Sequence, residues 1–77
     1  MKDTELRNKV IAFLEKEAAK CKTFPQMFTA QETAEAVGGV ATRIGVISND
    51  VVAELSARGI NIRYEKTTTS RRFVISK

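Results

Sequence analysis

The segment from Thr29 to Gly39 constrains the fold of this chain more than any other, because local chemistry fixes both of its ends. Thr29-Ala-Gln-Glu matches the capping box, in which the threonine hydroxyl accepts from the backbone N–H three residues later and the glutamate carboxylate accepts from the backbone N–H of the threonine. Gly38 can adopt the left-handed conformation that ends a helix. The segment therefore predicts a short helix from Thr29 to about Val37 and a tight glycine turn after it.

A longer helix is predicted before this segment, over about residues 4–20, where apolar residues recur every three or four positions. Asp3 or Thr4 can cap its start, and Pro25 disfavours helix at the residue before it. The helix should bury one stripe and expose the mixed-sign charges around it. That stripe consists of Leu6, Val10, Phe13 and Leu14.

Another helix is predicted after the glycine turn, starting at Thr42, which is a good N-cap, and stopping at Gly59. At about 100° per residue its apolar residues fall within one narrow stripe, so one face should be buried and the other exposed. The stripe consists of Ile44, Ile47, Val51 and Leu55.

The C-terminal residues alternate between apolar and polar over 60–64 and again over 71–77, which predicts a two-stranded β-hairpin. Pairing Tyr64 with Phe73 and Ile62 with Ile75 leaves residues 67–70 as a polar four-residue tip. Upstream, Met27-Phe28 is long enough only for a very short strand, which the sequence allows but does not require.

Positive charge is concentrated in this hairpin. The chain has 77 residues, enough for a single small domain over 1–77, and its net charge is +4. Residues 58–77 hold six basic side chains against Glu65 alone, whereas residues 1–57 are slightly acidic. A local basic patch favours polyanions such as DNA or RNA. The simpler alternative is a solvated hairpin edge that Lys and Arg keep soluble.

Several classes of function find no support in the sequence. Cys21 is the only cysteine and histidine is absent, so neither an internal disulfide nor a zinc site within one chain is expected. No serine has a histidine to activate it, and no phosphate-binding glycine loop is present. No apolar run approaches the roughly 18–20 residues of a membrane span. We therefore expect a cytoplasmic protein that is not an enzyme, with no cofactor, metal, membrane or small-molecule ligand.

The order helix, short strand, helix, helix, hairpin resembles the winged helix-turn-helix superfamily of DNA-binding proteins over nearly the whole chain. The local signature is Ala34-x-x-x-Gly38 followed by Ile44 and Ile47. In that superfamily a small residue lets two helices cross, a glycine makes the turn, and an apolar residue anchors the second helix. The resemblance implies an α+β winged helix with three helices and a two-stranded C-terminal wing. A rival alignment, Ala41-x-x-x-Gly45, would break the last helix at its glycine.

The resemblance implies duplex DNA as the partner, with the helix over 42–58 in the major groove and the hairpin over 60–77 on the backbone or minor groove. Asn49 can then pair bidentately with adenine, and Arg43 can reach guanine or phosphate. Such a protein would be a small transcriptional regulator or a phage or plasmid DNA-binding protein, associated with the nucleoid. The DNA-binding residues we expect are Thr42, Arg43, Asn49, Arg63, Lys66, Thr68, Arg71 and Arg72.

Two other partners remain open. The exposed face of the helix over 42–58 carries Arg43 as its only basic residue, and Asp50 lies at its edge. Such a face equally suits packing against another protein or a second copy of the chain. Tyr64 and Phe73 can stack on single-stranded bases or form the hairpin core. A winged helix that binds proteins, and one that grips an RNA backbone by its shape, are therefore the alternatives.

Overall fold

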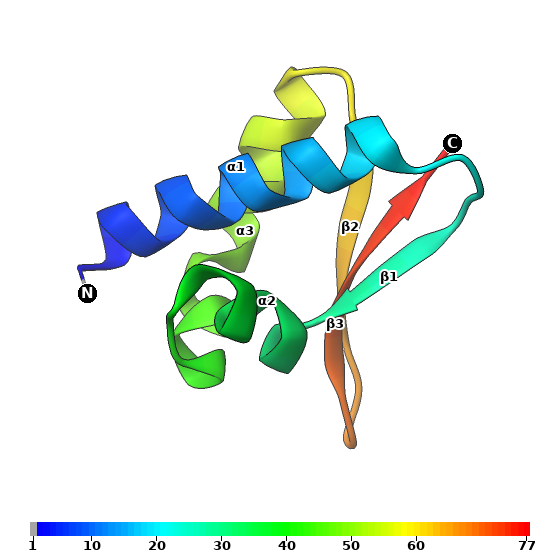
Figure 1. The fold of residues 1–77 in the computed structure, drawn as a ribbon. Coiled ribbons are helices and arrows are strands. Elements are labelled where there is room, and N and C mark those ends of the chain that lie inside the picture. The colour runs from blue at the N-terminus through cyan, green and yellow to red at the C-terminus, as the bar shows by residue number, and fades with distance from the viewer. Residues whose placement is uncertain (1) are drawn as a thin grey trace.

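Helices and strands follow one another along the chain in an α+β arrangement (Figure 1). The structure is a computed structural model and describes residues 2–77. Its elements are α1 (Asp3–Lys20), β1 (Gln26–Thr29), α2 (Ala30–Val37), α3 (Ala41–Ala57), β2 (Asn61–Lys66) and β3 (Arg71–Ser76). The α+β class and the three helices predicted from the sequence are confirmed.

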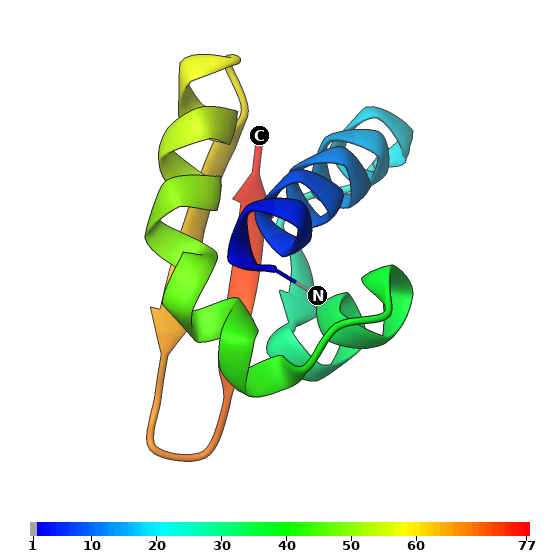
Figure 2. The ribbon, with the colours of Figure 1, turned by 90° about the vertical axis from the view of Figure 1, so that its left-hand side faces the viewer.

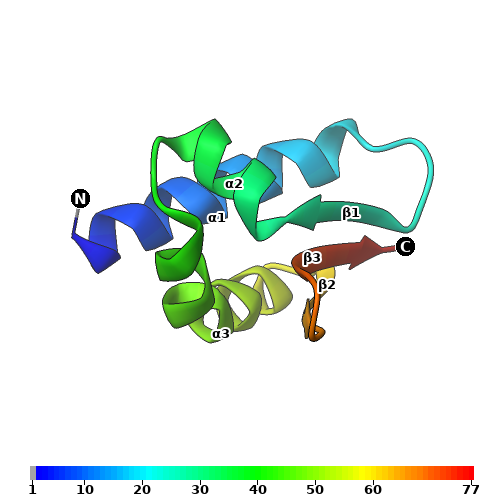
Figure 3. The ribbon, with the colours of Figure 1, turned by 90° about the horizontal axis from the view of Figure 1, so that it is seen from below.

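The sheet has three antiparallel strands in the order β1-β3-β2, so the prediction of a two-stranded sheet is wrong (Figure 3). The very short strand that the sequence allowed at Met27-Phe28 exists and extends over Gln26–Thr29. It pairs with β3 from Gln26 opposite Ile75 to Thr29 opposite Arg72. β3 becomes the central strand because β1 hydrogen-bonds to the N–H and C=O groups that a hairpin alone would leave unpaired.

The register of the hairpin follows the apolar alternation. Tyr64 lies opposite Phe73 and Ile62 opposite Ile75, as predicted. At the hairpin tip the Thr67 backbone N–H donates to the Ser70 carbonyl at 2.8 Å and closes the polar loop. Since strand side chains alternate between faces, this register decides which charged residues point toward the helices.

Both predicted ends of α2 are confirmed. The Glu32 backbone N–H donates to Thr29 Oγ1 at 3.0 Å, as predicted. The Glu32 carboxylate accepts from the threonine hydroxyl at 3.1 Å, whereas the predicted donor was the Thr29 backbone N–H. Gly38 ends the helix with φ of 76°, a left-handed conformation that residues other than glycine rarely adopt. A Cβ atom at Gly39 would lie 2.6 Å from Leu6 Cδ1 of α1, so a larger residue there would require the buried Leu6 side chain to shift.

The predicted caps of the two long helices are wrong by one or two residues. α3 begins at Ala41 with Val40 as its N-cap, in place of Thr42, and α1 begins at Asp3 after Lys2. Val40 follows the glycine turn in an extended conformation, and the Arg43 backbone N–H donates to the Val40 carbonyl at 3.0 Å. Thr42 therefore lies inside α3, where its side chain is exposed. The helix runs unbroken through Gly45, contrary to the rival alignment.

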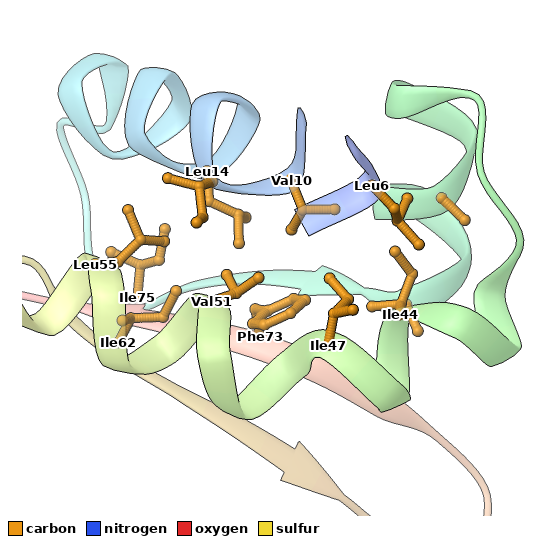
Figure 4. Close-up of a cluster of buried hydrophobic side chains, with 13 residues drawn as sticks. Leu6, Val10, Leu14, Ile44, Ile47, Val51, Leu55, Ile62, Phe73 and Ile75 are labelled. Atoms are coloured by element: carbon orange, nitrogen blue, oxygen red, sulfur yellow. The ribbon is translucent and has the colours of Figure 1, made fainter. Parts of the chain in front are cut away.

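The core lies between α1, α3 and the inner face of the sheet (Figure 4). Leu14 of α1, Leu55 of α3 and Phe73 of β3 have no exposed surface. Burial of a side chain of this size stabilises the fold by about 1.5–3 kcal/mol. Because the predicted apolar stripes of α1 and α3 both pack into this core, the opposite face of α3 stays exposed. The buried stripe residues are Leu6, Val10, Leu14, Ile44, Ile47, Val51 and Leu55.

Candidate nucleic-acid interface

A groove runs between the exposed face of α3 and the hairpin strands, which lie beside each other in Figure 2. Its volume is about 480 Å³. We call it the α3–hairpin groove. In two views the hairpin tip projects past the N-terminal end of α3 (Figures 1 and 2). The residues that line the groove are Thr42, Gly45, Val46, Ser48, Asn49, Tyr64, Lys66 and Arg71.

The α3 side of the groove is uncharged. Thr42, Val46 and Asn49 are exposed at spacings of four and three residues, which aligns them on one face of the helix. Val46 is 61% exposed. Gly45 adds no side chain, and the Ser48 hydroxyl is turned to the helix, where it donates to the Gly45 carbonyl at 2.9 Å. A surface of this kind can approach another molecule closely.

The hairpin side of the groove carries positive charge. Lys66 lies directly opposite Arg71 in the β2–β3 register, two residues from the Tyr64–Phe73 pair, so all four side chains share the face that points to α3. Within residues 2–77, neither Lys66 nor Arg71 forms an ion pair, whereas every other arginine does. The two cations thus leave the groove with a local excess of positive charge.

Arg63 and Arg72 point to the opposite face of the hairpin. Both donate to Glu65, from Arg72 Nε to Oε1 at 2.9 Å and from Arg63 Nε to Oε2 at 3.0 Å. These hydrogen bonds, first from Arg72 and then from Arg63, hold the pKa of the Glu65 carboxyl below its ordinary value. Of the four cations predicted in the hairpin, the groove therefore contains two.

Arg43 also forms an ion pair. Its guanidinium makes two hydrogen bonds to the Asp3 carboxylate, with Nε donating to Oδ1 at 3.1 Å and a second bond from Nη2 to Oδ2. The bond to Arg43 lowers the pKa of Asp3. This pair joins the first turn of α1 to the first turn of α3, and it could not be read from the sequence because 40 residues separate the partners.

Arg71 and Tyr64 lie close to Gly45 of α3 in the groove. The Arg71 Nη1 atom would lie 3.5 Å from a Cβ atom added at Gly45, and the Tyr64 hydroxyl would lie 3.8 Å from it. The Tyr64 hydroxyl is covered and has no hydrogen-bond partner in the described part of the chain. Burial raises the pKa of Tyr64, although the Arg71 charge opposes the shift. The centroids of the Tyr64 and Phe73 rings lie 4.8 Å apart, and both rings belong to or pack against the core. This fits the interpretation of the pair as the core of the hairpin.

A second hollow, of about 440 Å³, lies beside the hairpin tip. It contains the predicted residue Thr68 together with Thr42 and Arg71. The start of α2, at Thr29 and Gln31, forms its other wall. These two residues were not predicted as part of the site, although the N-cap at Thr29 was a signal that free backbone N–H groups of α2 begin there.

Comparison with protein-family models, with curated proteins and with solved structures gave no match to this chain. None of the helices within residues 2–77 combines the length and the apolar character needed to cross a bilayer. The same residues contain no group of three or more carboxylate, cysteine or histidine side chains that could hold a metal ion. The site must therefore be interpreted from its own geometry.

Proposed function

We propose that this chain is a winged-helix domain that binds duplex DNA in the α3–hairpin groove and its surroundings. The observation that supports this most is the position of Lys66 and Arg71, two cations that have no carboxylate partner among residues 2–77 and that face the uncharged surface of α3. Phosphate oxygens are the natural partners of such cations, and base edges suit a surface of small polar and apolar side chains.

The dimensions agree with α3 as the element that enters the major groove. An α-helix with its side chains is about 10–12 Å wide, and the major groove of B-DNA is about 12 Å wide. With 17 residues, α3 is one of the two longest helices of the domain. The side chains on its exposed face are short, so its backbone can approach the groove floor. The hairpin tip then lies where the flanking phosphates run.

The charge distribution sets the strength of binding that we expect. Each neutralised phosphate contributes about −0.9 to the slope of log affinity against log salt. All four hairpin cations together would give about −3 to −4, whereas Lys66 and Arg71 alone give about −2. A domain of this kind would serve as a small transcriptional regulator or a phage or plasmid DNA-binding protein, in the compartment that holds the DNA.

Fluorescence anisotropy with a labelled random duplex at several salt concentrations tests the proposal. Arg71→Ala should weaken binding to every sequence and reduce the salt slope by about 1. Arg72→Ala is the matched control, because it removes the same charge from the next residue but from the face where Glu65 holds it. It should change the affinity little.

Three outcomes would contradict the proposal. Absence of binding at about 50 mM salt and micromolar protein would remove the DNA function altogether. Equal effects of the two arginine variants would show that overall charge, not the groove, attracts the DNA. Duplex RNA provides a further comparison, since its deep and narrow major groove does not admit a helix. Equally tight binding of duplex RNA would argue against docking of α3 and for the RNA alternative.

A protein-binding module is the second candidate, and the exposure of Val40 and Val46 favours it. These side chains are 60% and 61% exposed at the turn before α3 and on α3 itself. Exposed apolar side chains on a weakly charged helix face suit a protein partner or a second copy of the chain. If duplex DNA is not bound, Val46→Glu should abolish binding to such a partner without unfolding the domain. Retention of the partner would count against this face.

A further inference from the structure

We infer that α3 reads A·T base pairs, with Asn49 bonding to adenine and Val46 contacting the methyl group of thymine in a neighbouring pair. The inference rests on the proposed DNA binding and names the base chemistry that the groove selects. It follows from the side chains that α3 exposes and from the ion pairs that engage its cations.

Guanine recognition lacks its usual donor on α3. Arginine or lysine bonded to O6 and N7 is the commonest specific contact to guanine. α3 and its C-cap contain two cations, Arg43 and Arg58, and both are engaged by carboxylates. Arg43 holds Asp3 through two hydrogen bonds. Arg58 bonds to Glu15 of α1 at 3.0 Å, and a weaker bond to Glu54 adds to this.

Adenine and thymine chemistry remains on the exposed face. The Asn49 carboxamide has a donor and an acceptor that match N7 and N6 of adenine in the major groove. Val46 is the only one of the three large exposed apolar side chains of residues 2–77 that lines the α3–hairpin groove. The thymine methyl group is the one apolar feature of the major groove that such a side chain can cover.

The spacing of the two residues fits neighbouring base pairs. Residues three apart on an α-helix are about 4.5 Å apart along its axis. Stacked base pairs rise by about 3.4 Å. Asn49 and Val46 therefore reach different but adjacent pairs when α3 lies along the groove. Lys66 and Arg71, on the hairpin side, then hold the backbone beside these pairs.

Four short duplexes with alternating sequence separate this reading from other kinds of selectivity. Alternating A·T is compared with A·U, which lacks only the methyl group, and with G·C. The fourth duplex is I·C, where inosine presents the major-groove edge of guanine but the minor-groove edge of an A·T pair. We expect A·T to bind about tenfold more tightly than G·C and I·C. Loss of the methyl group in A·U should weaken binding about fourfold.

Variants with matched controls assign the effects to single side chains. Val46→Ala should reduce the difference between A·T and A·U, because the shorter side chain covers less of the methyl group. Val40→Ala changes an equally exposed valine outside the groove and should keep the full difference. Asn49→Ala should lose most of the preference for A·T over G·C, whereas Asn8→Ala on α1 should not. All four positions are exposed, so folding should be retained, and circular dichroism verifies this.

Each remaining outcome overturns a defined part of the inference. Equal binding of A·T and G·C removes base selection by α3 while the proposed DNA binding stands. Equal binding of A·T and I·C assigns selection to the minor groove and overturns the roles of both residues. Equal binding of A·T and A·U by the unmodified protein removes the Val46 contact. Failure to bind any of the four duplexes overturns both the inference and the proposed function.

Discussion

Arg71 lies over the backbone of α3 at Gly45, so that a Cβ atom added to this glycine would be 3.5 Å from Arg71 Nη1. That separation is an ordinary van der Waals contact. Gly45 thus costs α3 some stability, as glycine does inside any helix, and keeps the floor of the groove open beneath a cation. Stability and binding should respond in opposite directions when this position is changed.

Gly45→Ala should stabilise the domain and weaken DNA binding. Alanine inside a helix is favoured over glycine by about 0.5–1 kcal/mol. The new methyl group would meet Arg71 and raise the groove floor, so the affinity for duplex DNA should fall by a few fold. Urea denaturation and anisotropy measure the two effects. Gly38→Ala is the control, since its φ of 76° should make alanine destabilising by about 1–2 kcal/mol. A destabilised Gly45→Ala variant would contradict the prediction.

Tyr64→Phe should stabilise the domain by about 1 kcal/mol, because it removes a covered hydroxyl that has no hydrogen-bond partner among residues 2–77. DNA affinity should stay within about twofold, because the covered hydroxyl is not exposed to bond to DNA. Loss of a real hydrogen bond to DNA would reduce the affinity more than that. Urea denaturation and anisotropy again provide the measurements. A marked loss of affinity would show instead that this hydroxyl becomes uncovered and contacts DNA.

The same residue should make stability fall at high pH. Burial raises the pKa of Tyr64 in the folded chain, so the unfolded chain loses the phenolic proton first as the pH rises. The raised pKa of Tyr64 therefore contributes to the free energy of unfolding below about pH 10, and this contribution is lost as the pH rises through the pKa of the folded state. The stability of the unmodified protein should decline more steeply above pH 10 than that of Tyr64→Phe. Parallel declines would contradict the shift.

Glu65→Gln should lower stability at neutral pH and have little effect in acid. Arg72 and Arg63 lower the pKa of Glu65, so its contribution is present above the ordinary carboxyl pKa and is lost as the pH falls through the folded value. Because the group is exposed, the melting temperature at pH 7 should drop by a few degrees at most. Melting curves at pH 7 and near pH 2 provide the comparison. A difference that persists unchanged in acid would sink the prediction.

Local patterns were sufficient to predict much of the fold. The alternation around Tyr64 and Phe73 determined the hairpin register, because a shift by one residue would expose the apolar face. The capping box at Thr29 and the glycine at position 38 determined both ends of α2. These features depend on residues a few positions apart. β1 was less certain, since four residues gain their strand conformation only by pairing with β3.

The charges of the site were harder to predict, because pairing over long range decides which are free. Arg43 looked available on α3, but its partner Asp3 is on another helix. The ion pair of Arg72 was easier to predict, because the predicted hairpin pairing already implied that Arg72 lies directly opposite Glu65. The availability of Arg71 follows from the same register. A count of basic residues therefore overestimated the binding charge, whereas the strand alternation contained the information needed to correct it.

Asp3→Asn should convert Arg43 into a free cation at the start of α3. The neutral side chain cannot hold the guanidinium as the carboxylate does, so Arg43 becomes able to bond to phosphate or to guanine. We expect tighter binding to random duplex DNA and a salt slope steeper by about 1. The preference for alternating A·T over alternating G·C should also narrow.

Glu5→Gln is the control for this gain, because it makes the same change in net charge on the same helix but affects the exposed pair of Glu5 with Lys9. It should raise the affinity less than Asp3→Asn does and leave the base preference unchanged. The pair of Asp3 and Arg43 also joins α1 to α3, so a slight fall in melting temperature should accompany the gain in binding. If the two variants bind DNA alike, net charge alone explains the gain, and Arg43 has no latent role in base recognition.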